Sequence, residues 1–297
     1  MKVVEAQKEV IKELLKNARS PETVTPETVY QIGNEVNRNI VSSMVEKIML
    51  PGSSIEGYEN LVELYNKSKS GKACLLLVEH YSNFDIPATY RLLEKQDSLG
   101  KEIADSIIAI AGMKLSVDSP MVRAFTEAYT RIVIYPSRTL KQFEGTPKFD
   151  EEKKLSNNIN RSALHAMIRA KHSGHIILVF PAGTRYREGD PSTKRGLPEI
   201  DSYLKSFDHV AFVGIAGNLL KVSDSMENDE INPDIMVLQA SPVYSAKEFR
   251  TKARESAAGD DLKQAAADSV MKTLEDLHEQ AQTIRRTRLA DLKQHLG

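Results

Sequence analysis

From Gly71 onward, short apolar runs rich in β-branched residues alternate with stretches of helical periodicity. This alternation limits the chain to an α/β fold, because strands that alternate with helices form a largely parallel sheet covered by helices. The sequence predicts strands at 74–78, 107–111, 131–135, 176–180, 210–215 and 235–238, and helices at 86–96, 119–129, 151–172 and about 260–295. We therefore expect an α/β fold with a mixed central sheet flanked by helices.

The first seventy residues carry a different pattern. Apolar residues recur at helical spacing over 3–17, from 26 to 48 and around 56–67, and the second of these stretches ends at Pro51 and Gly52. We therefore expect an N-terminal all-helical section at 1–70, followed by an α/β domain at 71–297 that ends in C-terminal helices.

Composition excludes several classes of function. The 40 Lys and Arg residues balance 41 Asp and Glu residues, so the net charge of −1 gives no support for a nucleic-acid partner. The single cysteine, Cys74, excludes an internal disulfide framework and a cysteine zinc cluster. The N-terminus lacks the apolar core of a signal peptide, and no apolar run is long enough to span a membrane. A cytoplasmic protein is therefore expected.

Peripheral contact with the inner face of a membrane is a further expectation. It rests on a lysine stripe at Lys8, Lys12 and Lys16 and on a basic cluster near the C-terminus, which comprises Arg285, Arg286 and Arg288. The alternative is that the lysines are solvated on a helix that packs in a bundle.

His80 follows the most apolar of the predicted strands, and Asp85 comes five positions later. On a continuous helix the two side chains would point about 140° apart, so they can meet only across a turn. Ser82 and Asn83 are residues typical of turns, and we expect Asp85 to cap the helix that follows. A carboxylate that accepts the Nδ1 proton of an imidazole leaves Nε2 free to act as a base. Alone, the pair could equally be a solvated histidine beside a capping residue.

Two further strand ends supply residues suited to binding an anion. Ser137 and Arg138 follow the strand at 131–135, and Gly183, Thr184, Arg185 and Arg187 follow the strand at 176–180. Glycine allows close approach of the backbone, and arginine presents a planar fork that matches phosphate or carboxylate. Because ligands collect at the carboxyl ends of parallel strands, these groups predict an anion site near His80.

Other motifs fail. Ser70-Gly71-Lys72-Ala73 lacks the first glycine and the hydroxyl of a phosphate-binding P-loop, and no Gly-x-Ser-x-Gly elbow is present. Three clustered histidines, His165, His172 and His175, lack further ligands for a metal. No metal, cofactor or protein nucleophile is expected. A base, its orienting carboxylate and an arginine pocket suit direct transfer of a group onto the hydroxyl of a phosphorylated alcohol.

These residues resemble the phospholipid/glycerol acyltransferase family. His80 to Asp85 match its His-x-x-x-x-Asp motif, and Phe180 to Arg185 match its Phe-Pro-x-Gly-Thr-Arg motif. The sequence is most similar to the soluble, plastid-type glycerol-3-phosphate acyltransferases. That likeness adds Ala111-Gly112, the segment from Ile134 to Arg138, the segment from Asn160 to Met167, the Arg185/Arg187 pair, and Asp190 to Thr193.

The resemblance implies transfer of a fatty acyl group from acyl carrier protein or coenzyme A to the 1-hydroxyl of sn-glycerol 3-phosphate. It implies His80 and Asp85 as the catalytic pair and Arg185 and Arg187 as phosphate ligands, with Arg138 as a third. An acidic carrier would need a basic docking patch, for which Lys194 with Arg195 is one candidate. Two alternatives stay open: acylation of 1-acylglycerol 3-phosphate at its second hydroxyl, and a catalytically silent protein that binds lipid or carrier.

The chain departs from the family pattern at several positions. Thr139 and Leu140 stand where the plastid-type pattern has Lys and His, Ala182 replaces a common Glu, and Glu79 replaces the usual Asn before His80. A carboxylate that faced the site would favour the imidazolium and weaken the base. On a strand, however, neighbouring side chains point to opposite faces, so we expect Glu79 to face away and activity to survive.

Overall fold

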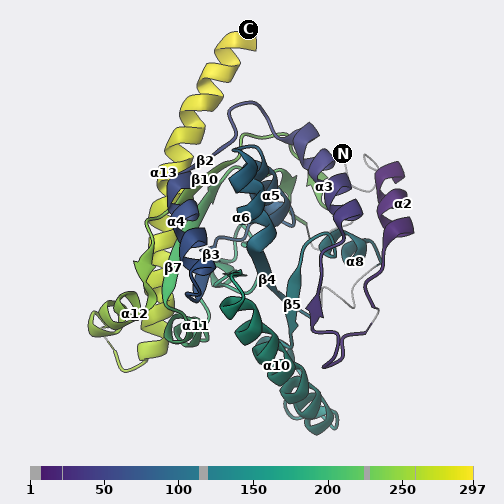
Figure 1. Cartoon of the computed structure of the whole chain (residues 1–297), viewed down its shortest axis with the longest axis vertical. Helices are drawn as coiled ribbons and strands as arrows, with labels where there is room; N and C mark the ends of the chain where they lie inside the picture. Colours follow the sequence, from purple (N-terminus) through teal and green to yellow (C-terminus); the bar gives the residue numbers. More distant parts are fainter. Residues whose placement is uncertain (1–7, 22, 114–119, 224–227, 258, 297) are drawn as a thin grey trace.

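A nine-stranded mixed sheet forms the centre of the computed structural model, which describes residues 8–21, 23–113, 120–223, 228–257 and 259–296 (Figure 1). Eight strands follow the order β1-β5-β4-β6-β3-β7-β10-β2, and β11 also pairs with β7. Their bounds are β1 Tyr30–Gln31, β2 Ser54–Glu56, β3 Cys74–Val78, β4 Ile107–Gly112, β5 Arg131–Ile134, β6 Ile176–Val179, β7 His209–Ala216, β10 Val237–Ala240 and β11 Tyr244–Ser245. The expected α/β fold with a mixed sheet is confirmed. Strands β8 Leu220–Lys221 and β9 Glu230–Ile231 form a separate hairpin.

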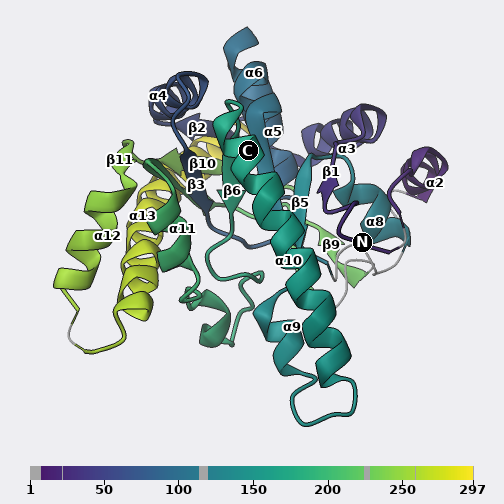
Figure 2. The ribbon, with the colours of Figure 1, turned by 60° about the horizontal axis from the view of Figure 1, so that its bottom comes forward.

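Helices cover both faces of the sheet. One face carries α2 Lys8–Asn17, α3 Glu35–Ile48, α4 Tyr58–Lys69, α5 Asp85–Glu94, α6 Ser98–Ser106 and α8 Pro120–Thr126. The other carries α10 Phe149–His172, α11 Ile200–Ser206, α12 Ala246–Glu255 and α13 Leu262–Leu296. On this second face α10 lies along β5 and β6, whereas α13 lies along β7 and β10 (Figures 1 and 2). The C-terminal helix therefore docks on the sheet.

Strand β3 lies in the interior of the sheet and is buried on both faces. Cys74, Leu76 and Val78 belong to the core on one side, and Leu75 and Leu77 belong to the core on the other. Each of these side chains is at most 2% exposed. Because successive side chains of a strand point to opposite faces, a central strand covered by helices must be apolar at every position. This requirement explains the unbroken apolar run that made β3 predictable.

The N-terminal section is not all helical, which corrects one expectation. The stretch from 26 to 48 forms β1 and then the shorter helix α3, and β2 precedes α4. The break falls at Gly33, whose amide donates to Thr130 Oγ1 at 3.0 Å, and a Cβ there would lie 2.9 Å from the Thr130 nitrogen. Asn34 then starts α3 by accepting a hydrogen bond from the Asn37 amide. The apolar core on this face also joins helices of both sections, from Ile11 to Met121.

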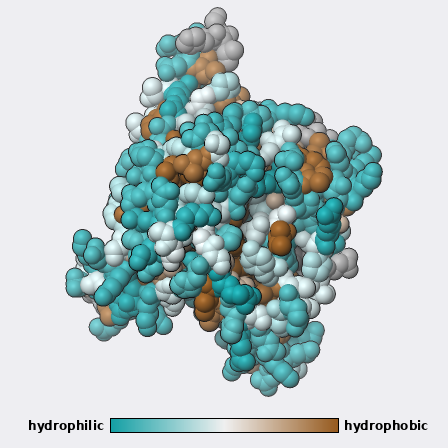
Figure 3. All heavy atoms as spheres, in the orientation of Figure 1, coloured by the Kyte–Doolittle hydropathy of each residue, from teal (hydrophilic) through white to brown (hydrophobic). Residues whose placement is uncertain are grey.

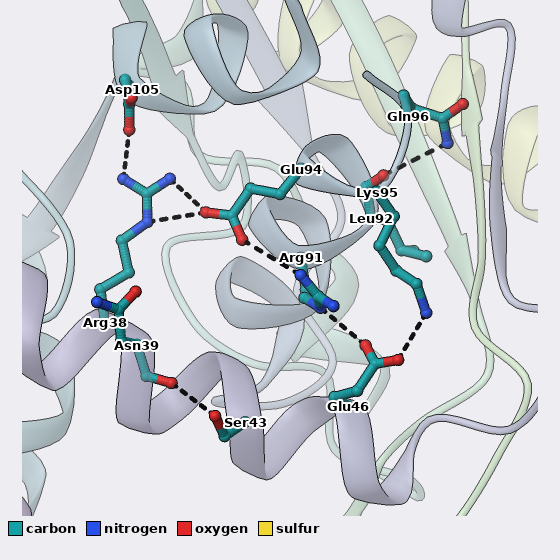
Figure 4. A network of polar contacts seen from close by, with 10 residues as sticks. All are labelled: Arg38, Asn39, Ser43, Glu46, Arg91, Leu92, Glu94, Lys95, Gln96 and Asp105. Atoms are coloured by element: carbon teal, nitrogen blue, oxygen red, sulfur yellow. Dashed lines mark hydrogen bonds and ion pairs between the residues drawn. The ribbon is translucent and has the colours of Figure 1, made fainter. Parts of the chain in front are cut away.

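A network of ion pairs fastens α3 to α5 and α6 (Figure 4). Arg38 of α3 binds Glu94 of α5 at 2.6 Å and Asp105 of α6 at 2.5 Å. About two turns farther along α3, Glu46 accepts from Arg91 of α5 and from Lys95 just beyond it, each at 2.7 Å. These contacts hold the N-terminal section against the helix that begins at Asp85.

On the face drawn in Figure 3, hydrophobic residues occur in separate small groups among hydrophilic ones.

Candidate active site

The carboxyl ends of five neighbouring strands meet at one edge of the sheet. Strands β5, β4, β6, β3 and β7 are parallel along this part of the sheet order, so the residues that follow each strand emerge on the same side. His80 follows β3, and the segment from Phe180 follows the adjacent β6. The edge of the sheet therefore brings two of the predicted motifs together, as expected for ligand sites in open α/β sheets.

His80 and Asp85 meet across the predicted turn. The Nδ1 atom of His80 lies 2.9 Å from Oδ2 of Asp85, whose side chain is 1% exposed. The same carboxylate oxygen accepts from the backbone amides of Tyr81 at 2.6 Å and Ser82 at 2.8 Å. An ionised acceptor fixes the proton on Nδ1, which leaves Nε2 with a free lone pair. Helix α5 begins at Asp85 itself, so its carboxylate braces the preceding turn and does not cap the helix.

The imidazole of His80 is also held from β6. Its ring stacks on Phe180, with centroids 3.9 Å apart and an angle of 9° between the planes. The backbone oxygen of His80 accepts from the Tyr186 amide at 2.8 Å. A small pocket, partly open to solvent, lies beside the ring and is lined in part by Phe180, Ala182, Tyr186 and Lys194. The histidine is therefore oriented from three sides at the wall of a pocket.

Hydrogen bonds from the segment Asp190 to Thr193 hold the loop after β6 in place. Asp190 Oδ1 accepts from the Ser192 amide at 3.1 Å, and Thr193 Oγ1 accepts from the Arg187 amide at 2.9 Å. Gly183 adopts a positive φ of 63°, and a Cβ there would lie 2.6 Å from Leu197 Cδ1. This glycine is therefore required by the turn, whereas Thr184 beside it is half-buried and Arg187 is exposed.

Arg185 lies next to a carboxylate that the sequence did not reveal. Its Nη1 atom lies 3.1 Å from Oδ2 of Asp229, which is fully buried in the segment before β9. Burial raises the pKa of Asp229, although hydrogen bonds from Ser223 and the Arg185 charge oppose the rise. One charge of the expected anion site is therefore already balanced by the protein. No local pattern signalled this pair, because its members are 44 positions apart.

Ser137 and Arg138 lie farther along the same edge. They follow β5, which is three strands from β3, or about 14 Å at ordinary strand spacing. Both are exposed, and Ser137 donates to Glu199 at 2.7 Å. The backbone before them is braced by Asn160 of α10, whose side chain bonds the Tyr135 amide at 2.8 Å and the Tyr135 oxygen at 3.0 Å. The Arg138 segment and the Arg185 segment therefore follow separate strands, β5 and β6, with β4 between them.

Glu79 contributes to the wall of the pocket beside His80, although we expected it to face away, and its bonds go to other residues. Its carboxylate accepts from the Ile215 amide at 2.8 Å and from the Tyr81 hydroxyl at 2.9 Å. It also lies 3.3 Å from Nδ1 of His278 on α13, which in turn lies 2.7 Å from the Ile215 oxygen. Burial lowers the pKa of His278, but the Glu79 carboxylate outweighs it, so the net shift is upward. Glu79 is thus engaged with His278, a residue that sequence reasoning did not single out.

The C-terminal arginine cluster is largely engaged in ion pairs. Arg285 binds Asp234 with two nitrogens, and Arg288 binds Glu56 at 2.7 Å. The prediction of membrane contact therefore rests on the lysines of the first helix. None of the described helices combines the length and apolar character needed to cross a bilayer. Within the described ranges, His, Cys, Asp and Glu side chains form no group of three or more placed to hold a metal ion.

No protein-family model matches the chain, and no curated protein matches its sequence. The resemblance to acyltransferases therefore rests on the motifs and on the order in which they occur.

Proposed function

We propose that the chain transfers a fatty acyl group from an acyl thioester to the 1-hydroxyl of sn-glycerol 3-phosphate, which is the first step of phospholipid synthesis. The observation that carries the proposal is the 2.9 Å contact between His80 Nδ1 and the buried Asp85, beside a pocket at the carboxyl edge of the sheet. The donor is acyl carrier protein or coenzyme A bearing the acyl group.

The chemistry follows from the free nitrogen of His80. Nε2 takes the proton of the 1-hydroxyl as that oxygen attacks the thioester carbonyl carbon. A C–O bond forms and the C–S bond breaks, and the leaving thiolate receives the proton from the imidazolium. Asp85 keeps the imidazole in the required tautomer and stabilises its transient positive charge. A positioned base of this kind contributes about 10² to 10⁴ to the rate.

Phosphate recognition is assigned in the proposal to residues at the carboxyl edge of the sheet that do not themselves line the pocket beside His80. The sequence-based ligands are Arg185 and Arg187, with Gly183 and Thr184 in the same turn, and Ser137 with Arg138 farther along the edge. Holding the phosphate places one hydroxyl in line with the base, which lowers the entropic part of the barrier. Arg185 can add only part of its charge, because Asp229 is paired with it.

Release of free thiol tests the proposal directly. Purified protein with an acyl thioester and glycerol 3-phosphate should release thiol, and both donors and both acceptors, glycerol 3-phosphate and 1-acylglycerol 3-phosphate, should be compared. His80→Gln should lower kcat by about 10² to 10⁴ while the Kd for glycerol 3-phosphate changes little. Asp85→Asn is the matched variant, since it retains size but loses the charge that fixes the tautomer.

The same assay separates the alternatives. A strong preference for 1-acylglycerol 3-phosphate would place the reaction at the second hydroxyl. Binding of lipid or carrier without thiol release, at any chain length, would leave a catalytically silent binding protein.

A further inference from the structure

Lys194 lines the same pocket as His80 of the proposed catalytic pair. Among the described residues that line the pocket beside His80, Lys194 alone is a lysine or an arginine. The other formal charge in the lining belongs to Glu79, which is bonded to Tyr81 and the Ile215 amide. A ligand in this pocket would therefore meet one uncommitted positive charge, at Lys194.

The ammonium group of Lys194 is held by aromatic rings and not by a carboxylate. Its Nζ atom lies 4.9 Å from the centre of the Tyr186 ring and 6.0 Å from that of the Tyr81 ring. Within the described part of the chain, no carboxylate comes within ion-pair distance of this nitrogen. Cation–π contacts position a cation but do not neutralise it. The half-buried lysine thus keeps its full attraction for an anion.

The loop that carries Lys194 is fixed before any ligand arrives. Lys194 ends the short 3-10 helix Pro191–Lys194, which Asp190 caps and Thr193 ties to the Arg187 amide. At its far end the Leu197 amide donates to the Pro181 oxygen at 2.9 Å. Both ring partners also belong to the site: the Tyr81 amide donates to Asp85, and the Tyr186 amide donates to His80. The position of the cation is therefore coupled to that of the base.

The competing cations are less well placed. Arg185 is paired with buried Asp229, and neither Arg187 nor Arg138 lines the pocket. The positions after Arg138, Thr139 and Leu140, are uncharged. The pocket thus receives positive charge from the loop after β6 and not from the loop after β5.

We infer that Lys194 binds the phosphate of the acceptor alcohol next to His80 and so determines specificity for a phosphate monoester. The inference rests on the proposed function for the identity of the alcohol, but the binding of phosphate can be measured without catalysis. It is an alternative to the expectation that Lys194 belongs to a docking patch for an acidic carrier protein.

The experiment compares Lys194→Met with Arg195→Met. The two changes remove one positive charge from adjacent positions, but Arg195 is exposed and does not line the pocket. Isothermal titration calorimetry with sn-glycerol 3-phosphate, inorganic phosphate and glycerol gives binding independently of turnover. Lys194→Met should weaken binding of both phosphates by about 10- to 100-fold, the range expected for one charged hydrogen bond. Arg195→Met should change neither, and Lys194→Arg should restore much of the affinity.

Kinetics with an acyl-coenzyme A donor distinguish the two sources of phosphate. Lys194→Met should raise the KM for glycerol 3-phosphate and leave the KM for the donor unchanged. A rise in the donor KM alone, equal effects of Lys194→Met and Arg195→Met, or no phosphate binding by the wild type would each overturn the inference. Lysine-dependent phosphate binding without acyl transfer would refute the proposed function and keep the inference. Acyl transfer by Lys194→Met with an unchanged KM for glycerol 3-phosphate would refute the inference and keep the proposed function.

Discussion

Removal of Arg185 should lower the free energy of unfolding, because it leaves a buried carboxylate at the edge of the site without its partner. Asp229 is fully buried, and its Oδ2 lies 3.1 Å from Arg185 Nη1. At that separation and an effective dielectric constant of about 20, two unit charges attract by roughly 5 kcal/mol. Removing one partner of a buried pair typically costs about 3–5 kcal/mol, because the other charge is left without compensation. Arg185→Ala should therefore lower the free energy of unfolding by about 3–5 kcal/mol near neutral pH.

The loss should depend on pH. Burial raises the pKa of Asp229 above its ordinary value of 3.8, so the native state holds this proton at a higher pH than the unfolded state does. The contribution of Asp229 to stability is therefore greatest below the unfolded pKa and is lost as the pH rises through the native pKa. Without Arg185 the native pKa should rise further. Arg185→Ala should consequently cost less at about pH 4.5 than at neutral pH, because a protonated Asp229 needs no cation.

Urea unfolding followed by circular dichroism measures both effects. Asp229→Asn supplies the matched background, since it keeps the shape of the side chain and removes its charge. In that background Arg185→Ala should cost less than about 1 kcal/mol, so the double-mutant cycle should give a coupling of at least 2 kcal/mol. An Arg185→Ala cost that is the same in both backgrounds and at both pH values would refute the reasoning. A KM effect of Arg185→Ala should be interpreted only after this stability loss has been measured.

Two further predictions concern the surroundings of the site. The raised pKa of His278 implies stability that is complete below about pH 6.5 and declines as the pH rises through the native pKa. The urea midpoint should follow that decline, and Glu79→Gln should flatten it; an equally steep profile in the variant would contradict the role of Glu79. Asn160→Ala should lower the unfolding free energy by about 1–3 kcal/mol, because both backbone groups of Tyr135 lose a partner. Asn158→Ala, an exposed position on the same helix, is its control, and equal losses in the two variants would argue against the brace.

The central strands of the sheet were predictable because strands buried on both faces appear in the sequence as uninterrupted apolar runs. The prediction at 74–78 coincides with β3, and the other five long strands were placed within about two residues of their observed ends. The strands β1 and β2 were missed because two or three residues at a sheet edge carry no pattern of their own. Val29 and Ile32 happen to continue the helical period of α3, although Ile32 is 79% exposed. Periodicity therefore extended that helix across the break at Gly33.

The candidate site, too, could be predicted from the sequence only in part. The His80–Asp85 contact could be predicted, because a turn of six residues fixes both ends of the pair. The partners Asp229 and His278 could not, since each reaches the site from a distant segment and neither stands in a motif. The place of Lys194 in the pocket lining was also hidden, because the sequence shows a basic dipeptide but not which of its members lines the pocket.

The position of β2 has a consequence for the order in which the chain can fold during synthesis. Ser54 pairs with Val237, so the strand waits for a partner that emerges about 180 residues later. At about 5–20 residues per second, a ribosome needs roughly 10–40 s to supply that partner. The partner of β1, which is β5, is made sooner. The neighbours of β3, which are β6 and β7, are made after β5 and before β10. The sheet should therefore assemble from the β1 side toward the opposite edge, with β2, although made early, among the last strands to pair.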